Sequence, residues 1–467
     1  MTDTKFDLPL NDENDAPVVR DVHTSRDFVQ SVLDAIKQND TVVVHELVDA
    51  LHAADLADLL EGLSSGYRKK LIAMLGGSLD PEVLHELEGL AQDEIYDHIP
   101  NKQIAQAVSD MDTDDAIYVL EELGEDDQQE ILKTLQADDR AAIEEGLSYP
   151  DESAGRLMQR DLVALPEFWS VGQAIDYLRD AKEKIADTFY EIFIVDPAYR
   201  PVGSMGLSTL LRAKRSQNIG DLMEQEQHLI KAKDDQEDVA YYFAKYHLIS
   251  AAVINEAGRL VGMITVDDVV DVIEEEVEED IMALAGVHES GLNESIIDMT
   301  RSRFVWLFVN LLTAVLASTV ISLFDASIEQ MVTLAVLMPI VASMGGNAGT
   351  QTMTVAVRAI ATRELTANNT WRTLNREFMV SVLNGSALAF VAGIVVWVWF
   401  GNATLSLVFA SAMIFNLIVA ALSGLLVPVA LERIGVDPAI SSSVFVTTIT
   451  DVVGFFAFLG LAAFILL

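Results

Sequence analysis

Long runs without a charged side chain dominate the second part of the chain. Residues 304–324 and 331–357 form two such runs, and a third lies between Glu377 and Glu432, where a polar Gly-Asn-Ala-Thr sequence at 401–404 divides it. About 20 apolar residues are enough for a helix to cross the hydrocarbon core of a bilayer. The sequence therefore predicts an all-α membrane domain of five spanning helices in contact with lipid, over residues 299–467, with the last helix over 439–467.

The negative charge of the chain lies entirely before this domain. The formal net charge is −42, from 72 acidic and 30 basic side chains, whereas the region from Arg301 onward holds seven of each sign. Such a charge repels the phosphates of nucleic acid and favours metal cations as partners. The sequence has no cysteine, which excludes disulfides, thiolate metal sites and thiol catalysis.

The arginines of the membrane domain predict its orientation. They precede the first predicted helix or lie between the second and third and between the fourth and fifth: Arg301, Arg303, Arg358, Arg363, Arg372, Arg376 and Arg433. Basic residues mark the cytoplasmic side of a membrane protein, and the acidic first residues do not resemble a signal peptide. We therefore expect an integral protein of the cell (plasma or inner) membrane, with its N-terminal half in the cytoplasm and its C-terminus outside.

One carboxylate, Asp451, interrupts the last apolar run. A charged side chain at mid-bilayer depth costs at least about 2.5–3.5 kcal/mol, so such residues usually face a pore, a cavity or a partner. Thr447, Thr448 and Thr450 place hydroxyl groups next to it. The pattern favours a path for a cation that includes Asp451 and Thr450.

The sequence MGGNAGTQ at 344–351 is unusually polar for a membrane helix. Small residues let helices approach closely, and irregular backbone at this depth is tolerated where it lines a cavity. For the glycines, helix packing alone is an equal alternative. The nearby amides favour a pore wall made of Gly345, Gly346, Asn347 and Gln351.

The acidic first half begins with a predicted disordered tail over residues 1–20. Residues 21–149 carry short amphipathic leucine patterns that are punctuated by Gly, Asp and Pro. Repeated short helices of this kind predict an α-helical, superhelical N-terminal domain.

A tandem repeat follows the helical domain. The sequence SAGRLM at 153–158 recurs as NIGDLM at 218–223, and each copy continues with a pattern of strand, turn, strand and helix. The pair resembles tandem CBS domains, an α/β module that often binds nucleotides or ions. The two domains are predicted over 150–214 and 215–270.

The resemblance to CBS domains implies a site for ATP. In that family a Thr followed three residues later by Asp can hold ribose and phosphate, and the second copy has this pair as Thr265 and Asp268. The first copy has Gly206 and Thr209 at these positions, so its side of an adenosine site is incomplete.

A strongly acidic helix without basic residues connects the repeat to the membrane domain and is predicted over 266–298. Its carboxylates fall along one helical stripe or directly beside it: Asp268, Asp271, Glu275, Glu276, Glu279 and Asp280. Like charges at these spacings destabilise a helix. A solvated face is the ordinary explanation. The alternative is a set of ligands for hard divalent cations, whose binding relieves the repulsion and makes the helix a switch.

The complete chain resembles the MgtE family of magnesium channels and transporters. The resemblance is carried by the order of the domains and by three motifs: Pro339 to Gln351, VDPA at 436–439 and TTITD at 447–451. It implies a homodimer whose second and fifth membrane helices line the pore. Asp451 is then the ion-selecting carboxylate, paired with its copy across the dimer axis.

The same resemblance implies that the acidic helix is a plug, held closed by cytosolic Mg²⁺. The implied ligands of the regulatory Mg²⁺ are Asp114, Asp268, Asp271, Glu276, Glu279 and Asp280. Tyr118 and His247 stand where the family can have acids, so we expect fewer or weaker Mg²⁺ sites between the domains.

We therefore expect a Mg²⁺-selective, Mg²⁺-gated channel or transporter for magnesium uptake down the electrochemical gradient, and not an enzyme. Two other functions are open on the residues alone. One is a membrane-anchored CBS sensor of metal or nucleotide, and the other is an ion-coupled exporter of divalent cations.

Overall fold

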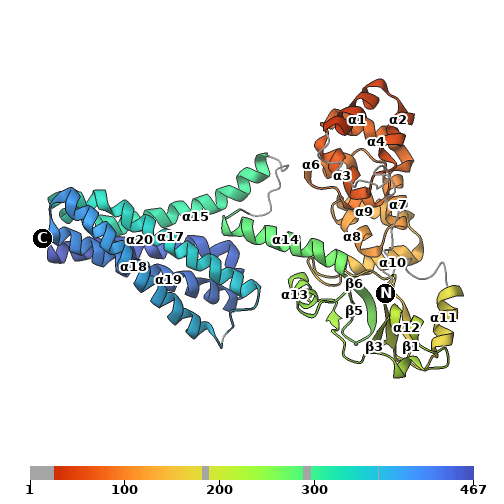
Figure 1. Ribbon diagram of the computed structural model, residues 1–467. Helices are drawn as coiled ribbons and strands as arrows, with labels where there is room; N and C mark the ends of the chain where they lie inside the picture. Colours follow the sequence, from red (N-terminus) through yellow and green to blue (C-terminus); the bar gives the residue numbers. More distant parts are fainter. Residues whose placement is uncertain (1–25, 181–188, 288–295, 367, 467) are drawn as a thin grey trace, which may run out of the picture. The chain divides into compact units, whose positions relative to one another are not determined.

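A computed structural model of the chain describes residues 26–180, 189–287, 296–366 and 368–466. The chain forms two compact units (Figure 1). Unit one is Met1–Asp235 with Ser250–Ile264, and unit two is Gln236–Ile249 with Thr265–Leu467. The predicted disordered tail over 1–20 lies outside the described residues.

Short α-helices build the N-terminal part of unit one, as the leucine patterns predict. Each helix contributes apolar side chains to one continuous core, for example Leu60, Leu71 and Leu120, which are fully buried. The helices in the described range from residue 26 to 146 are α1 (Arg26–Gln38), α2 (Thr41–Val48), α3 (Ala53–Gly62), α4 (Ser65–Leu75), α5 (Glu82–His85), α6 (Gly89–Tyr96), α7 (Asn101–Asp110), α8 (Thr113–Glu121), α9 (Glu125–Thr134) and α10 (Ala137–Gly146).

A buried arginine, Arg68 on α4, joins three of these helices. Its guanidinium donates hydrogen bonds to the carbonyl oxygens of Leu60 (2.8 Å) and Leu63 (3.0 Å), at the end of α3, and pairs with Glu94 on α6 at 2.7 Å. The last carbonyl groups of a helix have no N–H partner within the helix. Arg68 therefore satisfies the end of α3 while it fixes α4 and α6 against it.

The predicted tandem repeat forms two three-stranded sheets in unit one. Their orders are β1-β2-β3 and β4-β5-β6, and the first two strands of each sheet run parallel. The fold class predicted from the sequence, helical domain followed by an α/β CBS pair, is confirmed. The elements are β1 (Ala164–Pro166), α11 (Val171–Asp180), β2 (Glu191–Val195), β3 (Pro201–Gly206), α12 (Leu207–Arg212), β4 (Ile230–Lys231), α13 (Gln236–Tyr246), β5 (Ser250–Ile254), β6 (Leu260–Thr265) and α14 (Val266–Leu284).

The recurring Met and Gly residues of the two copies explain how the sheets associate. The backbone of Gln159, next to Met158 of the first copy, exchanges hydrogen bonds of 2.8 and 2.9 Å with Met263 on β6 of the second. A Cβ atom on Gly262 would lie 2.7 Å from the Met158 sulfur. In the equivalent contact of the other pair, a Cβ atom on Gly203 would lie 2.6 Å from the Met223 sulfur. Each repeat therefore completes the other, which is why both copies carry both residues.

Long helices form the membrane domain in unit two. The break predicted at 401–404 is confirmed, because Gly401 adopts a left-handed φ of 65° and Asn402 accepts a hydrogen bond from the Leu405 amide at 3.0 Å. The helices that follow α14 are α15 (Ile296–Ser322), α16 (Asp325–Gln330), α17 (Thr333–Ala361), α18 (Thr370–Phe400), α19 (Ala403–Arg433) and α20 (Pro438–Ile465).

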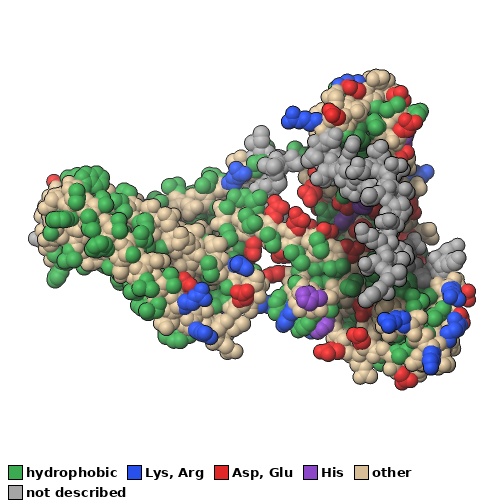
Figure 2. Space-filling model, viewed as in Figure 1, with side chains coloured by type: hydrophobic (Ala, Val, Ile, Leu, Met, Phe, Trp, Pro, Cys, Tyr) green, Lys and Arg blue, Asp and Glu red, His purple; other side chains and the backbone are tan. Residues whose placement is uncertain are grey.

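Four stretches of the described residues are long and apolar enough to cross a membrane: Met299–Ser322, Thr370–Phe400, Ala403–Arg433 and Ser442–Ile465. The remaining predicted span forms α17, a continuous helix of 29 residues. Its Gly, Asn, Thr and Gln residues lower its hydropathy, so its crossing stays a prediction. Figure 2 shows that apolar side chains cover most of the visible face of this helical domain.

Two boundaries differ from the sequence prediction. The acidic helix α14 ends at Leu284 rather than at 298, because Gly286 adopts a left-handed φ of 71° two residues later. Residues 288–295 of the predicted range lie outside the described part of the chain. The first membrane helix begins at Ile296, eight residues before the apolar run at 304.

The Arg68 contacts generate a stability prediction. Arg68→Met removes a hydrogen-bond donor from three carbonyl groups at the end of α3, those of Leu60, Glu61 and Leu63, and the partner of Glu94. It should lower the free energy of unfolding of the helical domain by about 1.5–3 kcal/mol. Hydrogen exchange of the α3, α4 and α6 amides in the full chain measures it. Lys70→Met, on the exposed side of α4, is the control and should leave exchange unchanged. Equal exchange in the two variants would contradict the role of Arg68.

Candidate functional site

The carboxylate that first pointed to a cation path, Asp451, lies half-buried on α20. Among the described residues, no basic side chain and no hydrogen-bond donor reaches its carboxylate. The hydroxyls of Thr447 and Thr448 donate to the carbonyl oxygens four residues earlier, at 2.9 and 2.6 Å, a common arrangement within helices. Asp451 therefore keeps its acceptor capacity for something other than this chain.

The six predicted pore residues fall into two sets in the single chain. Asn347 and Gln351 are exposed on α17, and Asp451 and Gly346 are partly exposed. Gly345 and Thr450 are instead buried where α17 meets α20: a Cβ on Gly345 would lie 3.3 Å from the Thr450 Cβ. In the single chain these two residues pack the helices together, and their place on the path stays a prediction.

A buried amide that the sequence prediction missed, Asn416 on α19, lies beside this contact. It is 1% exposed and donates a hydrogen bond from Nδ2 to the carbonyl oxygen of Val341 at 3.0 Å. A Cβ on Gly454 of α20 would lie 2.7 Å from this Nδ2 atom. Asn416 thus ties α17, α19 and α20 at one point. The only sequence signal was a lone Asn within an apolar run.

The end of the acidic helix packs onto the two predicted pore helices within unit two. Ala283 of α14 is 2% exposed and shares an apolar cluster with Met353 and Val357 of α17 and with Ala439 and Val446 of α20. The predicted plug helix therefore ends against the base of α17 and α20.

Two carboxylates face each other at this contact. Asp280 of α14 is half-buried, and its pKa is raised by burial and then by the like charge of Asp437. Asp437 caps the start of α20 by accepting a hydrogen bond from the Ala439 amide at 2.8 Å. The sequence prediction missed Asp437 as a member of the site, although its position before Pro438 is typical of a helix cap.

The other predicted Mg²⁺ ligands of α14 lie along the helix without forming a complete metal site. Asp271 is exposed, whereas Glu276 and Glu279 are partly buried, and Glu276 accepts a hydrogen bond from Gln236 of α13 at 2.9 Å. Among the described residues of one chain, no group of three or more His, Asp or Glu side chains gathers closely enough to hold a metal ion. The full ligand set stays a prediction.

The predicted nucleotide residues Thr265 and Asp268 contact each other. The carboxylate of Asp268 accepts hydrogen bonds from the Thr265 hydroxyl at 2.5 Å and from its amide at 3.2 Å. This is a capping box that begins α14. The ATP site stays a prediction, and the pair already has a structural role at the start of the helix.

Asp114 belongs to unit one and is 9% exposed on α8. Its neighbour Asp115 pairs with His85 at 3.4 Å, and the Tyr118 ring lies 4.9 Å from the His85 ring. Burial raises the pKa of Asp115, and His85 opposes the shift. Tyr118 therefore packs on a histidine where a metal ligand was expected. His247 occupies a left-handed turn (φ 54°) after α13.

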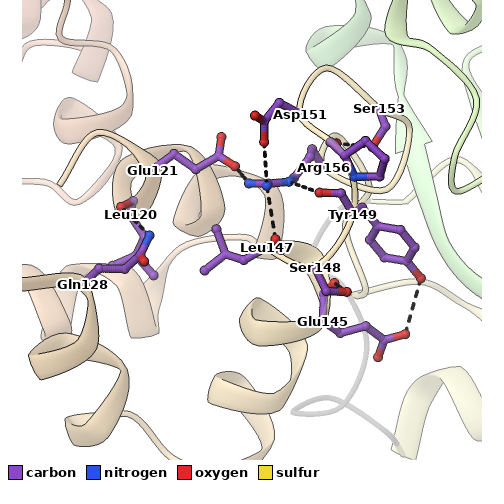
Figure 3. A network of polar contacts seen from close by, with 11 residues as sticks. Leu120, Glu121, Gln128, Glu145, Leu147, Ser148, Tyr149, Asp151, Ser153 and Arg156 are labelled. Atoms are coloured by element: carbon purple, nitrogen blue, oxygen red, sulfur yellow. Dashed lines mark hydrogen bonds and ion pairs between the residues drawn. The ribbon is translucent and has the colours of Figure 1, made fainter. Parts of the chain in front are cut away.

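The helical domain is joined to the CBS pair by Arg156 of the SAGRLM sequence (Figure 3). Its guanidinium forms ion pairs with Glu121 and Asp151 and donates to the carbonyl oxygens of Leu147 (3.1 Å) and Tyr149 (3.0 Å). These four acceptor groups come from α8 and from the segment 147–151 that follows α10, so Arg156 ties both to the start of the CBS pair. This joint lies wholly within unit one.

The fold and these sites define a polytopic helical membrane protein with an acidic part that contains a CBS pair. Three family models match the chain: a divalent cation transporter model over residues 338–461, the MgtE intracellular N domain over 51–152, and the CBS domain over 219–275.

Relatives match over nearly the whole length. The magnesium transporter MgtE of Thermus thermophilus is 31% identical over 93% of this chain and 98% of its own, and that of Bacillus subtilis is 30% identical over 89% and 92%. The chain belongs to the MgtE family. The crystal structure of the cytosolic domain of the Mg²⁺ channel MgtE in complex with ATP covers 52% of this chain at 29% identity, with a TM-score of 0.49.

The proximity of Asp280 and Asp437 generates a pH prediction. Because the pKa of Asp280 is raised when α14 is docked, the docked state binds protons more tightly, and docking weakens as pH rises through that pKa. Without divalent cations, Asp280→Asn should slow hydrogen exchange of α14 several-fold at pH 7, and its difference from wild type should shrink as pH falls through the raised pKa of Asp280. Glu274→Gln, exposed on the same helix, is the control. An Asp280→Asn effect of constant size as pH falls would refute a penalty on the charge of Asp280.

Proposed function

We propose that this protein is a magnesium channel or transporter that carries Mg²⁺ into the cell and is closed by cytosolic Mg²⁺. The observation that carries the proposal is Asp451, a half-buried carboxylate on an apolar helix with no basic partner in the described chain. The relatives in its family are named as magnesium transporters. A transporter of this kind needs no catalytic machinery.

The chemistry of one carboxylate favours a hydrated ion. Mg²⁺ gives up its water ligands reluctantly and is usually bound through one or two carboxylates with several waters retained. In a homodimer Asp451 and its copy would supply two carboxylates at one level of a symmetric path. Asn347 and Gln351 are exposed on α17, and their place on this path stays a prediction.

The membrane potential supplies the driving force. With the basic loops and the acidic half on the cytoplasmic side, two positive charges that move inward gain about 4.6 kcal/mol per 100 mV of inside-negative potential. Uptake therefore proceeds without ATP hydrolysis or a counter-ion.

Closure by cytosolic Mg²⁺ rests on the contact between α14 and the base of α17 and α20. There the pKa of Asp280 is raised by its burial and, as the second cause, by repulsion from the Asp437 carboxylate. A divalent cation near this pair neutralises the repulsion and holds α14 against Met353 and Val446. When cytosolic Mg²⁺ falls, the carboxylates of α14 repel their neighbours, the helix loosens and the path opens.

The transport function is tested by Mg²⁺ uptake into proteoliposomes. Asp451→Ala should abolish uptake, because it removes the negative charge that attracts the ion within the membrane. Asp325→Ala, an exposed acid of α16, is the control and should transport as wild type. Equal uptake by all three proteins would refute the proposal and favour a membrane-anchored sensor, and uptake that requires a counter-gradient would favour the ion-coupled exporter.

Closure is tested by varying Mg²⁺ on the cytoplasmic side of the same vesicles. The double variant Asp280→Asn, Asp437→Asn removes the repulsion that loosens α14 when Mg²⁺ is low, and should lower the Mg²⁺ concentration for half-closure by about tenfold, the effect of about 1.4 kcal/mol of relieved repulsion. Glu274→Gln is the control on the same helix. An unchanged half-closure concentration in the double variant would place the regulatory cation elsewhere.

A further inference from the structure

A groove of about 320 Å³ opens between α17 and α18, with Leu417 and Ala421 of α19 also in its lining. Both helices pack on α19, and Gly385 of α18 lies against Leu417, where a Cβ atom would make an ordinary van der Waals contact of 3.6 Å. Next to that contact, the facing sides of α17 and α18 form the walls of the groove. Its polar lining residues are Asn347, Gln351, Thr352, Glu377, Ser381 and Asn384.

The polar residues of the groove follow the helical repeat on both walls. Glu377, Ser381 and Asn384 are spaced by four and three residues, so they share one face of α18, and Asn347 and Gln351 are four residues apart on α17. The spacing places each set along the groove rather than around the helix. At membrane depth such groups need a polar partner, because lipid offers none.

The groove reaches the depth of Asp451. Asn347 lies 14 residues before the end of α17, and Asn384 lies 14 residues after the start of α18. At 1.5 Å per residue both amides are roughly 21 Å from the end of the domain where the two helices are joined. Asp451 lies 13 residues after the start of α20, or roughly 20 Å. Glu377 is nearer that end, at the mouth of the groove.

We propose that this groove binds a hydrated divalent cation, with Glu377 as its charged ligand and the amides of Asn347, Gln351 and Asn384 as acceptors for the ion's water. This proposal deepens the proposed function by adding a second cation site, and it rests on that function for the identity of the ion.

The chemistry of the lining selects this ligand over others. None of the described residues that line the groove is basic, so an anion would face the Glu377 carboxylate without compensation. A lipid chain would leave the three amides without partners. Six waters occupy roughly 180 Å³ at about 30 Å³ each, so a hexahydrated ion fits the groove with its waters, and one carboxylate suits an ion that keeps them.

The absence of cysteine from the sequence permits a test that needs no transport. Asn384→Cys is introduced into the full chain in lipid vesicles and reacted with a small, water-soluble thiosulfonate, with modification followed by mass spectrometry. The residue should react, and Mg²⁺ should slow the reaction by roughly tenfold at ten times its dissociation constant, when about 90% of sites are occupied. Cobalt hexaammine, an inert analogue of the hydrated ion, should protect as well.

Glu377→Gln, combined with Asn384→Cys in one chain, distinguishes a cation site from a groove that holds only water. It should raise the Mg²⁺ concentration for half-protection by at least about tenfold, because the number of carboxylates sets cation affinity. Glu364→Gln, an exposed acid of the α17–α18 loop, should not change it. Ser386→Cys, about 200° around α18 from Asn384, is the control for reagent access and should react little.

Several outcomes would overturn the proposal. An unreactive Asn384→Cys would mean that a helix of a second copy or lipid fills the groove. A reaction that Mg²⁺ does not slow, protection that Glu377→Gln leaves unchanged, or equal labelling of Ser386→Cys would also refute it. The labelling results are independent of Mg²⁺ uptake. If Mg²⁺ does not protect Asn384→Cys but uptake still depends on Asp451, only the cation site in the groove is rejected. If Mg²⁺ protects Asn384→Cys but uptake does not depend on Asp451, only the transport function is rejected.

Discussion

The close approach of α17 to α19 and α20 determines how the helices of the membrane domain pack. A Cβ on Gly424 of α19 would lie 2.6 Å from the carbonyl oxygen of Gly349, and one on Gly349 would lie 2.6 Å from Val446 of α20. Backbones this close make dispersion contacts with each other that larger side chains would prevent. Such close packing is a main source of helix association in lipid. With α17 held in this position, Asn347 and Gln351 are left on its exposed side, and its lower end forms the surface on which α14 rests.

Much of this architecture follows from local sequence. The break at residues 401–404 is a signal within a few residues, and it appears in the structure where the sequence predicts it. The faces of α17 could not be assigned in the same way. Gly345 and Thr450 resemble pore residues by composition but are buried, because burial depends on a helix far away in sequence. The pairing of Asp280 with Asp437 was missed for the same reason: each carboxylate has an ordinary local explanation, and only the packing of α14 on α20 brings them together.

The soluble part shows how a repeated sequence becomes a single module. Met158 and Met223 each insert against a glycine of the other repeat, so neither sheet has a complete surface alone. Arg156 then joins the pair to the end of the helical domain through carbonyl oxygens of the connecting segment and two carboxylates.

The capping box at Thr265 and Asp268 has a mechanical consequence. It starts α14 immediately after β6, with no loop between the strand and the helix. A rigid rod of 19 residues is roughly 28 Å long at 1.5 Å per residue. A tilt of about 10° at its fixed end moves its tip by about 5 Å, close to one helical turn. In the closure proposed above, a small rotation at the start of α14 would therefore be enough to withdraw Ala283 from the base of α17 and α20.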